Sequence, residues 1–265
     1  MLTGLFCVLS AMATALTYGL QPDLSLWWIP GLLVGYYLAV CIVYILVLLL
    51  FTLCLPRRDG YSPVCRWLLV WSIRWALPFL RCRLRVSGLE NLPDEPFLLV
   101  GNHVSNLDPM LALAAIPRRK LAFVSKPENF RYPIAGGLIR RSGFLAIDRE
   151  NPRNAVATIH QAAEMVKRGI CMGIYPEGTR NKSGEGLLPF HAGSFKIAKL
   201  AHCPIVVVAT QYGCPGFLGF KRAQVTVTAV LDTAYVDANR TDALSARTQE
   251  LLTEALTKQS GDNGS

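Results

Sequence analysis

Residues 97–110 read FLLVGNHVSNLDPM. This stretch decides the expected fold because its pattern predicts a strand, then a turn, then the start of a helix. The apolar run at 97–100 is typical of a short buried strand. Pro109 favours the first position of a helix, which would make Asp108 its N-cap. His103 is then predicted on the turn at the carboxyl end of a strand, where open α/β sheets bind their ligands.

His103 and Asp108 are five positions apart, and this spacing decides whether their side chains can act together. On a continuous helix, side chains five positions apart point roughly 140° away from each other, so these two meet only if the chain turns between them. If they meet, Asp108 can accept the Nδ1 proton of His103 and leave Nε2 to take a proton from a substrate. The alternative is a helix cap beside a loop histidine. No serine or cysteine is placed as a nucleophile, which favours direct attack by a substrate hydroxyl.

The flanking sequence alternates strand-like and helix-like stretches. This alternation predicts an α/β domain with a largely parallel central sheet flanked by helices, and the basic–apolar alternation at 81–86 predicts an edge strand. The predicted strands cover residues 81–86, 97–100, 121–125, 144–147, 170–175, 204–210 and 225–230. The predicted helices cover residues 64–79, 109–116, 136–141, 152–168, 193–201 and 242–257. The domain is expected to span 81–258 and to end in a flexible tail at 259–265.

The N-terminal part is too apolar for an ordinary soluble domain. Of 265 residues 52% are hydrophobic, the mean hydropathy is +0.33, and Asp23 is the only charged residue before Arg57. Leu32–Leu55 is an almost unbroken apolar run, which as a helix spans roughly 30 Å or more, enough to cross a bilayer. Residues 1–56 are therefore predicted to be a membrane anchor of one or two apolar helices.

Residues 57–80 combine arginines with tryptophans and are predicted to form an interfacial helix. By the positive-inside rule, the arginines after the anchor place the protein in a membrane with its domain on the cytoplasmic face. The eight cysteines are then expected to be reduced. Arg66 and Arg74 are candidates for lipid phosphates. The tryptophans fall on one side of a helix, where they either lie at the membrane boundary or pack against the domain core: Trp67, Trp71 and Trp75.

A second polar group, PEGTR at 176–180, directly follows the strand at 170–175. A parallel sheet brings it to the same edge as His103. Gly178 allows close backbone approach to a ligand, and Arg180 offers a planar fork for a phosphate. Glu177 is expected to orient the site or to hold Arg180. The alternative is a solvated turn closed by a Glu–Arg pair.

Weaker signals surround these two groups. Lys126 follows a strand and is a candidate for a second phosphate contact, whereas Asp148 and Arg149 are interpreted as a structural ion pair. The remaining histidines are expected to be surface or packing residues: His160, His191 and His202. The net charge of +9 next to an apolar anchor favours anionic lipid over nucleic acid.

Taken together, these residues resemble the glycerolipid acyltransferase family, whose best-known members are 1-acylglycerol-3-phosphate acyltransferases. The resemblance extends from about residue 83 to residue 230 and includes the family's N-H-x4-D pattern at 102–108 and its E-G-T-R pattern at 177–180. Two further blocks lie between 126 and 149 and after Pro204.

The resemblance implies an O-acyltransferase that acylates the sn-2 hydroxyl of lysophosphatidate, with His103 as general base oriented by Asp108. It implies acyl-CoA or acyl-carrier protein as co-substrate, no cofactor, no metal, and backbone N–H groups around Gly178 as oxyanion donors. The partners that the resemblance implies are membrane lipids and a lysophospholipid acceptor. It implies no binding to nucleic acid. The implied substrate-binding residues are Asn102, Ser105, Lys126, Glu177, Gly178, Thr179 and Arg180.

Three alternatives stay open at this point. The nearest is the same chemistry on another acceptor: glycerol-3-phosphate, another lysophospholipid or a lyso-aminolipid. A membrane hydrolase would use His103, Asp108 and His191 around a metal. A non-catalytic lipid-binding scaffold would keep the fold without the chemistry.

Overall fold

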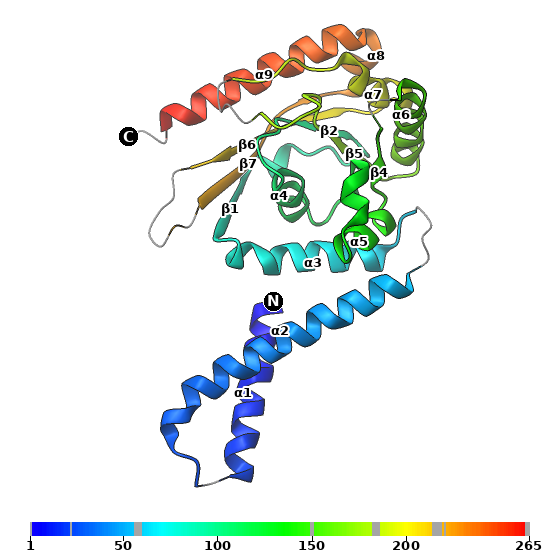
Figure 1. The fold of residues 1–265 in the computed structure, drawn as a ribbon. Coiled ribbons are helices and arrows are strands. Elements are labelled where there is room, and N and C mark those ends of the chain that lie inside the picture. Colours follow the sequence, from blue (N-terminus) through cyan, green and yellow to red (C-terminus); the bar gives the residue numbers. More distant parts are fainter. Residues whose placement is uncertain are drawn as a thin grey trace.

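A mostly parallel sheet forms the centre of the α/β domain (Figure 1). The computed structural model describes residues 2–21, 23–55, 60–148, 151–181, 186–213, 219 and 221–262, and within them the sheet has seven strands in the order β1-β7-β6-β2-β5-β3-β4. Every pairing is parallel except that of β6 with β7. The strands are β1 Cys82–Ser87, β2 Leu98–Gly101, β3 Leu121–Ser125, β4 Leu145–Ala146, β5 Cys171–Ile174, β6 Ile205–Tyr212 and β7 Lys221–Leu231. The predicted α/β class, parallel sheet and edge position of the first strand are confirmed.

Helices cover both faces of this sheet. One face carries α3 (Pro63–Phe79), α4 (Asp108–Ala115) and α5 (Ala135–Arg141), which contact one another through α3. The other face carries α6 (Pro152–Lys167), α7 (Lys196–Ala201), α8 (Thr233–Ala238) and α9 (Thr241–Asp262) (Figure 1). The core between the layers is built from aliphatic and aromatic side chains of the strands, several of which are fully buried.

Four local predictions differ from the structure. Asp108 is the first residue of α4 rather than its N-cap, and the capping position is held by Leu107. Helix α8 was not predicted, and β7 is longer than the apolar alternation indicated. Helix α9 continues to Asp262, so most of the stretch predicted to be a flexible tail is helical. Residues 263–265 lie outside the described chain.

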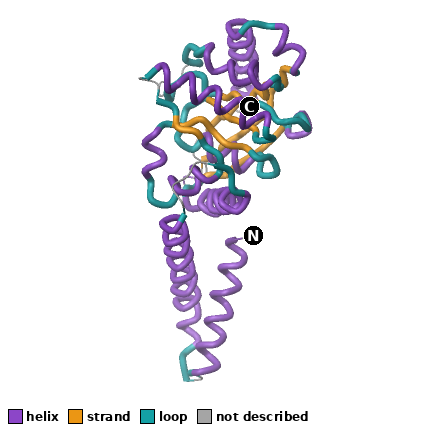
Figure 2. Tube along the Cα trace, turned by 90° about the vertical axis from the view of Figure 1, so that its right-hand side faces the viewer, coloured by secondary structure: helices purple, strands orange, loops and turns teal. Residues whose placement is uncertain are grey.

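The N-terminal residues form a helical hairpin of α1 (Leu2–Leu20) and α2 (Ile29–Cys54), which projects from the domain (Figures 1 and 2). The segments Thr3–Leu20 and Leu26–Cys54 are long and apolar enough to cross a membrane. Only 17% of each span is buried inside the protein, so most of its apolar surface is available to lipid. Arg57 and Arg58, on which the predicted orientation rests, lie outside the described residues.

Helix α3 lies between the hairpin and the domain and packs against both (Figure 1). Leu69 and Ile73 on one face are buried in the domain core. Trp71 and Trp75 instead pack with an aromatic cluster from the hairpin, formed by Phe6, Tyr37 and Tyr44. The sequence left open whether these tryptophans lie at the membrane boundary or pack against the domain core. Packing against the core does not hold for Trp71 and Trp75, because their partners belong to the anchor.

Arg66, on the same helix, does not reach a lipid phosphate as predicted. Its side chain is buried and donates to the carbonyl oxygen of Arg119 at 3.3 Å. Burial lowers the pKa of its guanidinium to about 10.

Candidate active site

Three neighbouring strands carry the polar residues predicted from the sequence. In the sheet β5 lies between β2 and β3, and both pairings are parallel. Their carboxyl ends therefore meet at one edge, which receives residues 102–108 after β2, residues 176–180 after β5 and Lys126 after β3. The prediction that the two motifs share an edge is confirmed.

The loop after β2 turns, and the turn brings His103 to Asp108. His103 Nδ1 and Asp108 Oδ2 are 2.8 Å apart. An ionised carboxylate can only accept a hydrogen bond, so Nδ1 carries the proton and Nε2 keeps its lone pair. The side chain of Asp108 is fully buried, whereas that of His103 retains 19% exposure and lines a cavity. This is the arrangement of a general base and the acid that orients it.

Three further donors hold the Asp108 carboxylate. The backbone N–H groups of Val104 and Ser105 each donate to Oδ2 at 2.8 Å, and the hydroxyl of Tyr212 donates to Oδ1 at 2.7 Å. Its position at the first residue of α4 adds the favourable end of the helix dipole. Burial and the adjacent carboxylate raise the pKa of Tyr212, so the phenol stays protonated and remains a donor.

Sequence reasoning did not find Tyr212. It lies on β6, 104 residues from Asp108, and no local pattern links the two positions. Only the register that places β6 beside β2 brings its hydroxyl to the site.

A stack of aromatic rings fixes the plane of the imidazole. The His103 ring lies 4.5 Å from the ring of Tyr175 at an interplanar angle of 16°, and Tyr175 stacks in turn on Phe123 at 5.5 Å. Burial raises the pKa of Tyr175 well above its usual value, so this ring is neutral. Gly173 leaves room for the stack, because a Cβ there would lie 2.2 Å from the Phe123 ring.

Glu177 holds the two motif loops together. Its Oε1 accepts from the backbone N–H of His103 at 2.7 Å, and its Oε2 accepts from that of Leu188 at 3.1 Å. The N–H of Asn181 donates back to the His103 carbonyl at 2.7 Å. Burial raises the pKa of the Glu177 carboxyl, although these donors oppose the shift. Glu177 therefore orients the site, and the structure, where it describes both side chains, shows no ion pair with Arg180.

Asn102 and Ser105 also face the protein rather than a ligand. Asn102 is buried and exchanges two hydrogen bonds of 2.8 Å with the backbone of Thr210, which ties β2 to β6. The Ser105 hydroxyl accepts from the N–H of Leu107 at 3.2 Å. Neither residue lines the cavity beside His103.

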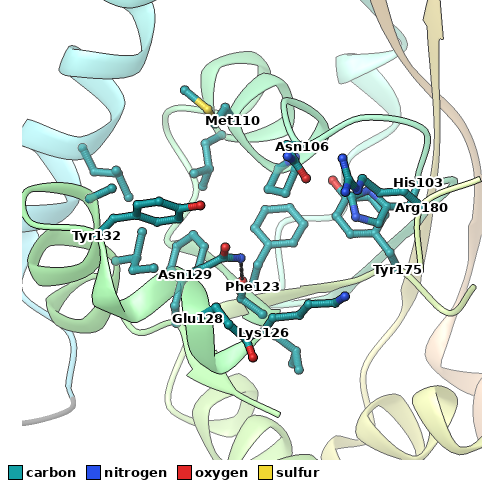
Figure 3. A pocket seen from close by; sticks show the side chains of 18 of the residues that line it. His103, Asn106, Met110, Phe123, Lys126, Glu128, Asn129, Tyr132, Tyr175 and Arg180 are labelled. Carbon is teal, nitrogen blue, oxygen red and sulfur yellow. Dashed lines mark hydrogen bonds between the residues drawn. The ribbon is translucent and has the colours of Figure 1, made fainter. Parts of the chain in front are cut away.

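That cavity, called the catalytic cavity below, encloses about 650 Å³. Its polar end contains five of the residues predicted from the sequence: His103, Lys126, Gly178, Thr179 and Arg180. Figure 3 shows His103, Tyr175 and Arg180 together at one end and Tyr132 at the other. Further polar side chains line it between these ends: Asn106, Ser125, Glu128 and Asn129. Apolar side chains from α3, α4, α5 and the segment before β4 complete the wall: Leu69, Ile73, Met110, Leu113, Ile139 and Phe144.

The turn at Gly178 narrows the choice of oxyanion donors. Gly178 has a φ of +73°, in the left-handed region that favours glycine. Its N–H donates to the carbonyl of Tyr175 at 3.1 Å and closes the turn, so of the N–H groups around Gly178 its own is already used. Arg149 and residues 182–184 lie outside the described chain.

The structure gives no support to a metal centre. Over the described ranges, no three His, Cys, Asp or Glu side chains come together as ligands, and His191 does not join His103 and Asp108. None of the seven cysteines for which the structure gives a position is part of a disulfide.

Comparisons with known proteins agree with this architecture. The Acyltransferase family profile matches residues 83–211. A chloroplastic 1-acyl-sn-glycerol-3-phosphate acyltransferase of Brassica napus is 36% identical over 52% of this chain and 40% of its own. The human 1-acyl-sn-glycerol-3-phosphate acyltransferase beta is 32% identical over 66% and 62% of the two chains.

Among solved structures, the 1-acyl-sn-glycerophosphate acyltransferase PlsC from Thermotoga maritima shares the fold, with a TM-score of 0.61, 23% identity and coverage of 72% and 78% of the two chains. The chain spans about half the length of the curated relatives it matches. The fold, the matched region and these relatives show that the chain belongs to the acyltransferase family that includes the 1-acyl-sn-glycerol-3-phosphate acyltransferases.

Proposed function

We propose that the protein transfers an acyl chain from an acyl thioester to the free sn-2 hydroxyl of lysophosphatidate and so forms phosphatidate. The observation that carries this proposal is the buried His103–Asp108 pair, which opens onto a cavity with cations at the same end and apolar walls beyond. The names of the relatives point to the same substrate.

The proton path follows from the geometry of the pair. His103 Nε2 removes the proton of the acceptor hydroxyl as its oxygen attacks the thioester carbonyl carbon. Asp108 keeps the imidazole in the required tautomer and stabilises the imidazolium that forms. When the carbon–sulfur bond breaks, the thiolate takes the proton back from the imidazolium. The histidine is then ready for another turnover, and no covalent acyl-enzyme is needed.

The cations at the polar end recognise the acceptor's phosphate. Arg180 and Lys126 both line the catalytic cavity and come from adjacent parallel strands. A guanidinium can bind two phosphate oxygens at once, and an ammonium adds a point charge. The N–H of Thr179, next to the closed turn at Gly178, is the proposed donor to the oxyanion, since Thr179 lines the cavity beside His103.

The apolar walls suit acyl chains. Leu69 and Ile73 of α3 form one wall, and the same helix packs on the hairpin through Trp71 and Trp75. The cavity is therefore on the side of the domain that faces the anchor, where lysophosphatidate and phosphatidate are dissolved in lipid. We include in the proposal a membrane location with the domain on the cytoplasmic face, and acyl-CoA or acyl-carrier protein as the donor.

An assay of detergent-purified full-length protein tests the proposal. Radiolabelled acyl-CoA and, in a parallel series, radiolabelled acyl-carrier protein are offered with lysophosphatidate, glycerol-3-phosphate, other lysophospholipids and a lyso-aminolipid, with His103→Ala as the blank. We expect lysophosphatidate to be acylated fastest and chelation to have no effect. Faster transfer to another acceptor would show that this acceptor, and not lysophosphatidate, is the substrate. If neither donor acylates any acceptor, the acyltransferase proposal is refuted and the non-catalytic lipid-binding scaffold is the remaining alternative.

A further inference from the structure

A second cavity lies where the hairpin meets the domain. It encloses about 460 Å³ between the end of α2, the 3₁₀ helix Pro127–Arg131 and α5, and is called the α2–α5 cavity below. Its lining comes from all three elements: Thr52, Leu53, Leu55, Phe130, Arg131, Tyr132, Pro133, Gly136, Gly137 and Arg140.

The position of this cavity relates it to the bilayer. The apolar span of α2 ends at Cys54, so Leu53 and Leu55 mark the level at which hydrocarbon gives way to head groups. The cavity therefore lies at the water–lipid boundary, with apolar side chains from α2 and polar ones from the domain. A lipid could enter it with its acyl chains still in the membrane.

The charge of the cavity selects the head group. Among the described residues that line it, Arg131 and Arg140 are cationic and none is acidic. The Arg140 guanidinium lies 5.2 Å from the centre of the Phe130 ring, which restrains it at the cavity wall. Two arginines at the head-group level favour a phosphate, because guanidinium groups bind its oxygens in pairs.

Two adjacent glycines keep the cavity's walls close together. A Cβ at Gly136 would lie 2.4 Å from the Phe130 carbonyl oxygen, and one at Gly137 would lie 3.0 Å from the Cβ of Thr52. Helix α5 is thus in direct contact with both the 3₁₀ helix and the end of the membrane helix. Such a site is formed before the ligand arrives, which lowers the entropy cost of binding.

The α2–α5 cavity is separate from the catalytic cavity but adjoins it. Tyr132 lines both, and it is the only residue named in both linings of the described chain. Arg180 and Lys126 belong to the catalytic cavity alone.

We propose that the α2–α5 cavity binds the phosphate head group of an anionic glycerophospholipid from the bilayer, with Arg131 and Arg140 as its charged contacts. This second lipid site does not depend on acyl transfer. It holds a lipid beside the catalytic cavity and ties the domain to the membrane surface at the foot of α2.

Lipid binding to the full-length protein in detergent, counted by native mass spectrometry, tests this proposal. The background variant, which carries Lys126→Ala and Arg180→Ala, removes both proposed phosphate contacts of the catalytic cavity, so that the remaining phosphatidate binding reports the α2–α5 cavity. In that background, the double substitution Arg131→Gln and Arg140→Gln should raise the Kd for phosphatidate about tenfold or more, since each lost bond was charge-assisted. Arg240→Gln is the matched control, because that side chain is 90% exposed and lies before α9 on the opposite face.

Phosphatidylcholine with the same acyl chains and inorganic phosphate complete the experiment. Phosphatidylcholine should bind more weakly than phosphatidate, and millimolar inorganic phosphate should not displace the lipid. The proposal is overturned if the double variant binds phosphatidate as its background does, if Arg240→Gln weakens binding equally, or if inorganic phosphate competes as an equal. A protein that binds lipid as described but transfers no acyl chain would refute only the proposed function.

Discussion

Two histidine–aspartate pairs occur among the residues that the structure describes, and their lengths are nearly the same. His103 Nδ1 lies 2.8 Å from Asp108, and His202 Nδ1 lies 3.0 Å from Asp237. Their surroundings differ: the side chains of the first pair are 19% and 0% exposed, whereas those of the second are 69% and 40% exposed. Distance alone therefore does not mark a catalytic pair.

Burial and the surrounding donors make the difference. The carboxylate of Asp108 is held by four donors from two parts of the chain, residues 103–105 and Tyr212, and its histidine faces a cavity. The pair of His202 and Asp237 joins the end of α7 to α8 at the surface, where solvent screens the charges and the pair contributes little to stability. Each prediction below sets a residue of the buried pair or its cavity against an exposed counterpart.

The largest difference should come from removing each histidine. His103→Ala should reduce acyl transfer to the blank rate, a loss of at least about 10³-fold, because the general base is gone. His202→Ala should retain wild-type kcat. Circular dichroism and thermal unfolding of both variants check that the fold is kept. Comparable activity of the two variants would remove the distinction between the pairs.

Replacing each acid by its amide should give the next largest difference. Asp108→Asn is expected to reduce kcat by about 10⁴-fold, as loss of the carboxylate does in a catalytic triad, because the amide favours the wrong imidazole tautomer. Asp237→Asn should leave kcat unchanged. Steady-state kinetics with saturating lysophosphatidate measure both effects. An Asp108→Asn enzyme within tenfold of wild type would show that the acid does not orient the base.

Arg180 tests whether the cavity beside the buried pair binds the phosphate. Arg180→Ala should raise KM for lysophosphatidate by about tenfold to a hundredfold with a smaller effect on kcat, since a charge-assisted hydrogen bond is lost. The exposed Arg240→Gln serves as the control. Initial rates over a range of acceptor concentrations separate KM from kcat. An unchanged acceptor KM in Arg180→Ala would dismiss the phosphate assignment.

Tyr212 should show the smallest effect of the four. Tyr212→Phe removes the donor to Asp108 Oδ1 and should lower kcat about tenfold while KM for both substrates stays the same. Tyr235→Phe, on the helix that carries Asp237, should change neither parameter. A Tyr212→Phe variant with altered KM but normal kcat would indicate a contact with substrate instead of with the acid.

The sequence predicted the features that depend on neighbouring residues, namely the approximate positions of the strands and the starts of some helices. Apolar runs bounded by Pro and Gly located all seven strands approximately, and Pro109 and Pro152 marked the starts of two helices. The meeting of His103 and Asp108 was predicted on condition of a turn, which the structure contains. The shared edge of the two motifs followed from the parallel sheet alone.

Tertiary packing decided the rest. Tyr212 reaches Asp108 across 104 residues, and the partners of Trp71 and Trp75 come from the hairpin, so neither relation leaves a periodic pattern. Asp108 stands where the sequence predicts an N-cap, yet its carboxylate accepts from the N–H groups of Val104 and Ser105, which precede it in the chain. For Glu177 the sequence left open whether it orients the site or holds Arg180, and only the fold shows that its oxygens accept from the N–H groups of His103 and Leu188.

The two faces of helix α3 contact different parts of the protein, the hairpin on one side and the catalytic cavity on the other. Trp71 and Trp75 rest on the hairpin, while Leu69 and Ile73, on the same turns, line the catalytic cavity. Both sets of contacts belong to one helix, so a tilt of the hairpin that moves α3 would also move two side chains in the lining of the catalytic cavity. If the hairpin spans a bilayer and the cavity holds acyl chains, as proposed, the thickness of the membrane would then influence the shape of the cavity.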